Sequence, residues 1–311
     1  MIIKHVLKFS QANNYLACIN LLESILVQLL SVYLIYRNNY WGTIIYSLTM
    51  VRIFIQMHDM AHYSFFKNNR FNNDIGQILG VITFMPFLAW KNGHNHHHKH
   101  FGNLDKNDAS QTILFTKKEY DSMPKFKKLL IRIFRDPFVF FTLSIPFLWF
   151  FGSIIFNFKR YGISSAITLQ KFFSFFYVYI MIKYFHIPCI PFLIAIYMSA
   201  VIGGILFHLQ HSVNIPYRKR NESWNKDDAS LEGSTFIVIP YPLSFFTNGI
   251  EFHHIHHQNT MVPCYNLSKC HYSIDYKEWE MVGVNKVNLK LAFQSLSNVM
   301  LDEDKNFLIS F

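Results

Sequence analysis

Long apolar runs alternate with short polar segments along this chain, and two of the runs form a pair near its start. Residues 15–36 contain enough apolar positions to span a bilayer as a helix, although Glu23 lies within them. A polar turn follows, and residues 41–57 form a second apolar run. About 20 helical residues cross a bilayer, and about 17 is the lower limit. We therefore predict a membrane hairpin whose second helix ends at the bilayer surface, just before His58.

Four further apolar segments follow the hairpin, and their lengths differ. Residues 75–90 are short and contain two glycines and a proline, so we expect a re-entrant or surface-lying segment there rather than a span. Residues 137–156, 172–184 and 191–207 are also apolar. No run long enough to cross a membrane follows His208.

The number of crossings limits which of these segments span the membrane. Histidine-rich segments can share one site only if they lie on one side of the membrane. Three crossings between Arg135 and His208 would place His208 on the opposite side. We therefore predict that residues 137–156 form a re-entrant or interfacial pair of half-helices, with Pro146 at the bend. About four transmembrane helices remain, with both termini on the cytoplasmic side.

The composition supports a membrane protein and explains the charge. Hydrophobic residues make up 51% of the chain and charged residues only 15%, whereas charged residues are about 25% of typical soluble domains. The net charge is +10, but lysine and arginine cluster beside the apolar runs, above all in residues 117–135. The positive-inside rule explains this pattern without a nucleic-acid partner and places the segment in the cytoplasm. Such a segment also suits anionic lipid headgroups or an acidic electron donor.

Histidine is the unusual component, because most of its 16 residues gather in short motifs. The first motif has two histidines at positions i and i+4, which lie on one side of a helix, namely His58 and His62. Alone, this motif is also explained by an ordinary interfacial pair. The second motif places five histidines within residues 94–100, and three of them share one helical face: His94, His97 and His98.

The spacing H-x-x-H-H recurs more than 150 residues later, as His253, His256 and His257. Two copies of one ligand spacing are difficult to attribute to chance. His211, at the end of the last apolar run, is a further candidate ligand. For His208, in the preceding turn, a ligand role and a packing role both stay open.

These histidines exceed the needs of one ion, since about four ligands fill a structural zinc site and about three a catalytic one. Two metals with four or five ligands each fit the number better. A nitrogen-rich ligand set with vacant positions suits a redox-active first-row metal, and iron is the usual choice for oxygen chemistry. Asp59 lies between two candidate ligands and could orient one of them by accepting a hydrogen bond from its second ring nitrogen.

Over residues 51–270 these motifs resemble the membrane fatty acid desaturase family. HDMAHYSFF is similar to the family's first histidine box, and HNHHHKHFGNLD, which follows Trp90 and three further residues, is similar to the second. LFHLQH resembles the extra histidine before the third box. EFHHIHHQNTMVPCYNL resembles the third box of the acyl-lipid omega-6 (delta-12) group. Met60-Ala61 and Ser212-Val213-Asn214 depart from the pattern, which leaves the position of the new double bond open.

The resemblance implies an all-α integral membrane protein of one domain, residues 1–311, with a cytoplasmic histidine-rich cap and a cytoplasmic C-terminal tail over residues 275–311. It also implies a desaturase that uses two iron ions, dioxygen and two electrons to introduce a double bond into a membrane-lipid acyl chain. A separate electron donor, of the ferredoxin or cytochrome b5 type, would supply the electrons. The implied iron ligands are His58, His62, His94, His97, His98, His211, His253, His256 and His257.

Two other classes of protein compete with this interpretation. A lipid or carotenoid hydroxylase or ketolase would use the same histidines and differ in where its substrate lies. A metal transporter or a non-catalytic metal-binding membrane protein would place histidines or acidic residues in the middle of its spans. Here the histidines follow the ends of the apolar runs, which favours the enzyme.

Overall fold

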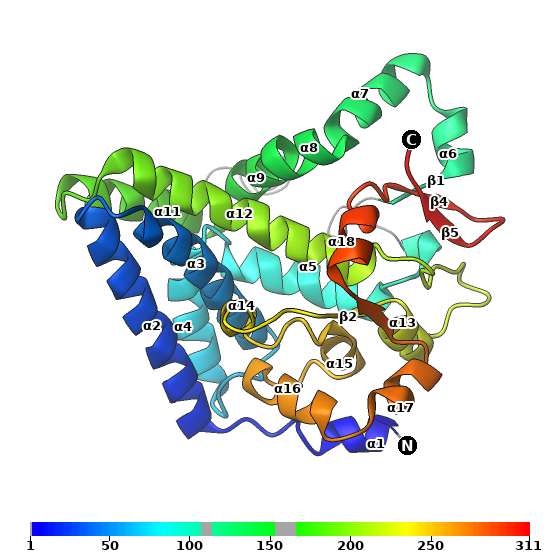
Figure 1. Ribbon diagram of the computed structural model, residues 1–311, viewed down its shortest axis with the longest axis horizontal. Coiled ribbons are helices and arrows are strands. Elements are labelled where there is room, and N and C mark those ends of the chain that lie inside the picture. Colours follow the sequence, from blue (N-terminus) through cyan, green and yellow to red (C-terminus); the bar gives the residue numbers. More distant parts are fainter. Residues whose placement is uncertain (1, 107–113, 153–165) are drawn as a thin grey trace.

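The computed structural model describes residues 2–106, 114–152 and 166–311, and most of them are helical (Figure 1). A short helix, α1 (Ile2–Leu7), precedes a hairpin of two long helices, α2 (Asn14–Tyr36) and α3 (Tyr40–Ala61). The asparagine before each long helix caps it, because its side chain accepts hydrogen bonds from backbone N–H groups of the first turn. The structure therefore contains the predicted hairpin, but α3 continues through His58, so the first histidine motif lies in its last turn.

Two helices within the described residues are long and apolar enough to cross a membrane, α2 and α12 (Cys189–His211). A bent pair that includes α7 would be a third if it forms one span. The outer face of α2 carries three leucines that are 54%, 57% and 61% exposed, Leu22, Leu26 and Leu29. Water would not accommodate so extended an apolar face, whereas lipid would. The chain is therefore a membrane protein.

The short apolar segment over residues 75–90 is divided between two helices of 14 residues each, α4 (Asn69–Ile82) and α5 (Phe87–His100). Neither helix has the roughly 20 residues that a crossing requires. Lys171 of α11 (Ala166–Lys183) is completely buried, and its ammonium group donates to the carbonyl of Phe84 between the two helices. The side chain of Trp149 donates to the carbonyl of Thr83 at 2.9 Å. These contacts satisfy backbone groups that the break between α4 and α5 leaves without helical partners.

The segment from Pro137 to Gly152 is helical throughout, and the predicted bend at Pro146 is wrong. It comprises α8 (Pro137–Val139), η2 (Phe140–Ser144), α9 (Ile145–Phe147) and η3 (Leu148–Gly152). The bend, of 64°, lies between α7 (Lys125–Arg135) and this segment, at Asp136. The remainder of the predicted segment, residues 153–156, lies outside the described residues.

Local contacts explain the position of this bend. The side chain of Asp136 accepts hydrogen bonds from the N–H groups of Phe138 and Val139, so it ends one helix and begins the next. Pro146 has no N–H with which to bond the carbonyl of Thr142. That carbonyl instead accepts a hydrogen bond from the hydroxyl of Tyr197 on α12, and the helix continues.

The prediction of an all-α protein missed two small sheets. One has the order β1 (Phe115–Thr116), β4 (Met300–Asp302), β5 (Phe307–Ile309), with β1 and β4 parallel and β4 and β5 antiparallel. In the other, β2 (Thr235–Ile237) pairs in parallel with β3 (Asn285–Val287). Strands this short show no alternating pattern, and most of their partners are distant in sequence, so the pairing was not visible beforehand.

Short helices make up much of the remaining structure, two of them before α12 and the others after it. They are η1 (Leu104–Lys106), α6 (Lys117–Ser122), α13 (Lys226–Glu232), α14 (Leu243–Thr247), α15 (His253–Gln258), α16 (Cys264–Tyr272), α17 (Tyr276–Met281) and α18 (Leu289–Ser295). The last of these segments pack on the rest of the protein, since Trp279 of α17 is completely buried.

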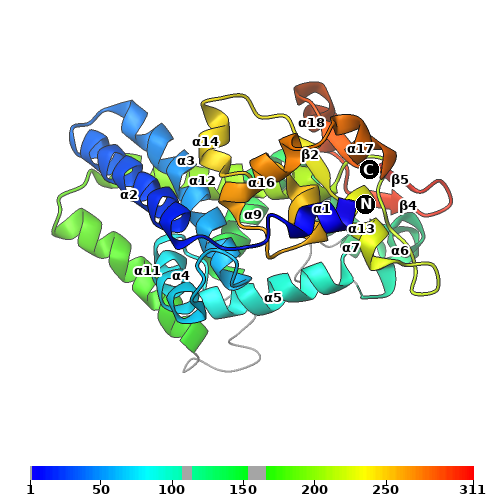
Figure 2. The same cartoon turned by 90° about the horizontal axis from the view of Figure 1, so that it is seen from below.

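The long helices and the short elements occupy opposite ends of the molecule. The hairpin and the loop between α11 and α12 lie on the left of Figure 1, and the strands with α6, α13 and α17 lie on the right. Both ends of the described chain lie on that right side, in Figure 1 and in Figure 2. The end of α12, α5 and α15 meet in between, and these elements carry histidine motifs.

Candidate metal centre

Four helices supply the histidines of the centre. α3 carries His58 in its last turn and is followed directly by His62. α5 carries the second motif, α12 ends at His211, and α15 consists of the third motif. The spacing within each motif places its histidine rings on one side of the helix. The four helices pack with these sides facing one another, so the ring nitrogens converge.

Five histidines form the first group: His58, His62, His94, His98 and His256. Each offers one ring nitrogen, and these five atoms all lie within 4.8 Å of one another. The Nε2 atoms of His58 and His94 are 2.7 Å apart. The Nε2 atom of His98 lies 3.0 Å from that of His94 and 3.0 Å from that of His256. The members of the group come from three helices or their ends.

A second group lies beside the first and contains His97, His211 and His257, whose nitrogens also lie within 4.8 Å of one another. The Nε2 atom of His97 is 3.2 Å from that of His211 and 3.3 Å from that of His257. His253 adjoins this group, because its Nε2 atom lies 3.0 Å from Nε2 of His211. The structure thus brings together the nine histidines that the resemblance to desaturases implied.

Hydrogen bonds alone do not explain this arrangement of nitrogens. A neutral imidazole has one N–H and one acceptor nitrogen, so each ring nitrogen can either donate or accept one good hydrogen bond. Nε2 of His98 lies 3.0 Å from Nε2 of both His94 and His256, and it cannot form a good hydrogen bond with each of them. Nε2 of His62 is buried and has no hydrogen-bond partner within the described part of the chain. Ring nitrogens that converge on common points suit bound cations, as in other histidine metal sites. The residues present therefore fit two metal ions.

Burial keeps these rings neutral and ready to bind metal. Desolvation lowers the pKa of His94, His98, His253, His256 and His257 well below the ordinary value, and the neighbouring histidines lower it further. Only the neutral ring offers a lone pair to a metal. Burial thus favours the neutral, metal-binding form of these five rings.

Asp59 is completely buried and contacts two parts of the centre. Its Oδ1 atom lies 3.1 Å from Nδ1 of His58, and its Oδ2 atom accepts a hydrogen bond from the backbone N–H of Cys264 at 2.5 Å. The first contact is the one that the sequence suggested for this carboxylate. The second one, to the start of α16, had no signal in the sequence, since 205 residues separate the partners.

His208 lies outside both groups. Its Nε2 atom is 2.9 Å from the carbonyl oxygen of Ser295, and its ring lies against Phe141 with ring centroids 5.3 Å apart. The structure therefore assigns His208 a packing contact, the second of the two roles that the sequence left open. His96 and His100 also lie apart from the groups, with their rings tilted against each other and ring centroids 4.3 Å apart.

Aromatic rings border the two groups, and one of them was missed in the sequence. Trp90 stacks on His94 with ring centroids 4.7 Å apart. Phe101 lies 4.3 Å from the ring of His211 and 4.8 Å from that of His257. Phe101 directly follows α5, in the continuation of the second motif. Only that position in the sequence could have suggested that Phe101 packs against the histidines.

Comparison with known proteins identifies the family. The sequence profile described as "Fatty acid desaturase" matches residues 39–282. The chain belongs to the fatty acid desaturase family. It is 31% identical over 278 residues to the protein named "Fatty acid desaturase" from Bacillus subtilis (strain 168), which covers 86% of this chain and 76% of that protein. The family predicted from the histidine motifs is confirmed.

Other relatives carry more specific names. The chain is 27% identical over 274 residues to the "sn-1 oleoyl-lipid 12-desaturase" of Picosynechococcus sp. (strain ATCC 27264 / PCC 7002 / PR-6), covering 85% of this chain and 76% of that protein. It is 24% identical over 277 residues to the chloroplastic "Omega-6 fatty acid desaturase" of Spinacia oleracea, covering 82% of this chain and 58% of that protein. These names match the omega-6 (delta-12) group that the third histidine motif suggested.

An apolar pocket adjoins the histidines of this desaturase family member. Its walls come from α3, α12 and the segment before α15, and they include Val51, Phe54, Ile55, Gly203, Leu206, Phe207 and Ile250. Three ligand candidates also line it, His58, His94 and His253. The pocket thus touches His58 and His94 of the first group and His253, which adjoins the second.

Proposed function

We propose that the chain is a dioxygen-dependent, di-iron desaturase of lipid-linked acyl chains, of the omega-6 (delta-12) kind. Membership of the family makes it an oxidoreductase that acts on fatty acyl chains. The observation that carries the finer proposal is the pair of histidine groups beside one apolar cavity.

Each histidine group would hold one iron ion. The first ion would bind to His58, His62, His94, His98 and His256, and the second to His97, His211, His253 and His257. When bound, iron supplies the oxidising chemistry for removing two hydrogens from an unactivated chain, which acid–base side chains cannot perform.

The protein's own residues would hold the substrate and keep water away. Val51, Phe54 and Ile55 form one apolar wall from three positions of α3, and Leu206 faces it from α12. A saturated chain gains free energy by leaving water for such a wall, about 0.8 kcal/mol for each buried CH₂ group. Asp59 would hold the ring of His58 through its Nδ1 atom, which leaves Nε2 free to face the metal.

The proposed topology has four spans, α2, α3, α11 and α12, with the metal centre and both ends of the described chain on the cytoplasmic side. α3 and α12 end at the same histidine cluster, which supports a single sidedness for the site. The basic helix α7 would then lie at the cytoplasmic surface. A separate donor, of the ferredoxin or cytochrome b5 type, would deliver the electrons.

The test is expression in a host that makes only saturated and monounsaturated acyl chains, followed by mass spectrometry of its total fatty acids. The parent chain should form a new diene, and His94→Ala should form none. His96→Ala is the matched control, since His96 lies on the same helix but outside both groups, and it should retain the product. A hydroxylated product would instead indicate a hydroxylase. Purified protein without iron would reject the proposal.

A further inference from the structure

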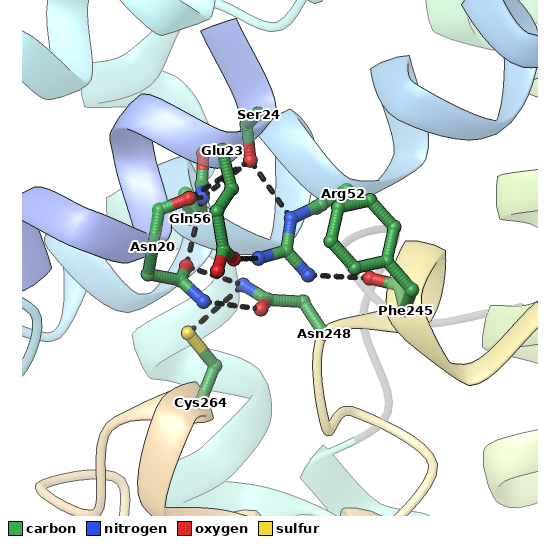
Figure 3. A network of polar contacts seen from close by, with 8 residues as sticks. All are labelled: Asn20, Glu23, Ser24, Arg52, Gln56, Phe245, Asn248 and Cys264. Atoms are coloured by element: carbon green, nitrogen blue, oxygen red, sulfur yellow. Dashed lines mark hydrogen bonds and ion pairs between the residues drawn. The ribbon is translucent and has the colours of Figure 1, made fainter. Parts of the chain in front are cut away.

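A buried polar network joins the hairpin of α2 and α3 to α14, Asn248 and α16 (Figure 3). Its central residue is Arg52 of α3, which is only 3% exposed. The guanidinium group donates to Oγ of Ser24 at 2.8 Å, to Oε2 of Glu23 at 2.8 Å, and to the backbone carbonyl of Phe245. It also lies over the ring of Phe245, 4.0 Å from the centroid. An ionisable group inside a membrane hairpin is costly to bury, and such residues generally serve a function.

The network joins segments that are far apart in the sequence. Gln56, one turn after Arg52, donates to Oγ of Ser24 at 2.7 Å and to Oδ1 of Asn20 at 2.8 Å. The side chains of Asn20 and Asn248 exchange two contacts, of 2.9 and 3.1 Å. Asn248 also lies 3.1 Å from Sγ of Cys264, at the start of α16. The hairpin is thereby attached to the segment between α14 and α15 and to α16.

The attached segment leads directly into the third histidine motif. Asn248 and Gly249 both adopt left-handed backbone conformations, with φ of 49° and 85°. A Cβ atom at Gly249 would lie 2.5 Å from the carbonyl oxygen of Cys264, so the close approach requires glycine. Ile250 follows and lines the apolar cavity, and His253 is a ligand candidate. The position of this turn therefore sets the position of a cavity wall and of a ligand.

Arg52 lies behind the opposite wall of the same cavity. Its neighbours on α3, Val51 and Ile55, line the cavity, whereas its own side chain extends toward α2 and α14. The contact with Phe245 thus ties the wall from α3 to the segment that carries Ile250.

We propose that Arg52 is a positioning residue, which fixes the segment 245–253 against α3 and so sets where an acyl chain lies relative to the metal centre. This inference rests on the proposed desaturase function. To hold this segment, Arg52 needs the several N–H donors of its guanidinium group more than it needs the positive charge. The side chain of Glu23 is 47% exposed, so its ion pair is weakened by its surroundings. The contacts with Ser24 and Phe245 are buried or partly buried, and lysine cannot reproduce the planar fork that makes them together.

The experiment compares Arg52→Lys, Arg52→Gln and Glu23→Gln with the parent chain. Arg70→Gln is the matched control, because Arg70 forms an exposed ion pair with Asp74 on α4. Each protein is assayed for iron content, for kcat and KM, and for the double-bond positions in its products. Arg52→Lys should retain iron, and its kcat should fall by about tenfold to a hundredfold. A substrate misplaced by about 1 Å can react about a hundredfold more slowly. Arg52→Lys should also spread the double bond over neighbouring positions, whereas Glu23→Gln and Arg70→Gln should keep the parent's product.

Amide hydrogen exchange of residues 245–253 gives a readout that does not depend on activity. Exchange should rise in both Arg52 variants and stay unchanged in Arg70→Gln. If Arg52→Lys keeps the parent's exchange and product positions, the inference is wrong. Equal losses in Glu23→Gln and Arg52→Lys would also overturn it in favour of a simple ion pair. If Arg52→Gln does not fold, Arg52→Lys decides. A parent chain without product, but with the expected exchange, would reject the desaturase function and support the positioning role of Arg52.

Discussion

The Nε2 atoms of His58 and His94 lie 2.7 Å apart, although the residues are 36 positions apart and belong to different helices. This contact joins the end of the membrane hairpin to α5, the helix that carries the second motif. Two neutral rings can share only one proton in such a contact, and both also lie within 4.8 Å of three other histidine nitrogens. The convergence of five ring nitrogens, of which this pair is a part, is what suits a bound cation.

His208 and His211 stand in successive turns of α12, and their substitution should separate packing from metal binding. His211→Ala should lower bound iron and reduce product formation by about a hundredfold or more, because a ligand is lost. His208→Ala should retain iron and lose about 1 kcal/mol of stability with its contact to Ser295. Iron analysis and thermal unfolding measure the two effects. Equal iron loss in both variants would contradict the assignment of His208.

Asp59→Asn should weaken metal binding while leaving every ligand in place. An amide can accept a hydrogen bond with its oxygen only, so it cannot face both Nδ1 of His58 and the N–H of Cys264 as the carboxylate does. Loss of such a contact behind a ligand typically lowers metal affinity by about 10–100-fold. Competition with a chelator measures the affinity. Asp74→Asn, at an exposed ion pair of α4, should have no effect, and an unchanged affinity in Asp59→Asn would reject the role.

Two adjacent glycines on α12 should respond differently to larger side chains. Gly203 lines the apolar cavity, and among the described residues an added Cβ would meet just the ring of Trp149, at 3.7 Å. Gly203→Leu should therefore fold with its iron and convert long acyl chains about tenfold more slowly, by filling space in the cavity. A Cβ at Gly204 would lie 2.6 Å from Cγ2 of Ile145. Gly204→Ala should cost about 1–3 kcal/mol by overpacking α12 against α9.

Chain-length profiles and thermal unfolding distinguish these two variants. Gly203→Leu should change the profile more than the unfolding midpoint, and Gly204→Ala the reverse. A profile that Gly203→Leu leaves unchanged would show that the acyl chain does not occupy this cavity.

His271 should make stability depend on acid pH. Burial, with a smaller effect of Lys286, lowers the pKa of His271 to about 4, and its Nδ1 atom lies 3.2 Å from Nε2 of His254. The unfolded chain binds the proton near pH 6.5, before the folded one does. The stabilisation is therefore complete above about pH 6.5 and is lost as the pH falls from there through about 4.

His271→Phe should remove this contribution, since phenylalanine does not titrate and can still stack on Trp279. The unfolding midpoint of the parent, measured from pH 7 to 4, should fall more steeply than that of the variant. The difference between the two proteins should be independent of pH above pH 7. Parallel curves over the whole range would contradict the assignment.

Local spacing made part of this protein visible in the sequence. The H-x-x-H-H motif turns His94, His97 and His98 to one side of a helix whatever surrounds it, because helix geometry fixes that side. The same holds for the apolar length of α2, which predicts a span without tertiary information. The family was predicted from the resemblance of these motifs to its histidine boxes, and the match over residues 39–282 confirms it.

Tertiary structure alone decided which histidines come together in each group. His94 and His98 contribute to the first group, whereas His97, between them in the sequence, faces His211 and His257 in the second. This division depends on where α12 ends and how α15 packs against α5, which no local spacing encodes. The packing of His208 on Ser295 and the burial of Arg52 between α2 and α14 have the same origin. In each case the contacting residues are far apart in the sequence, and only the packing of distant helices brings them together.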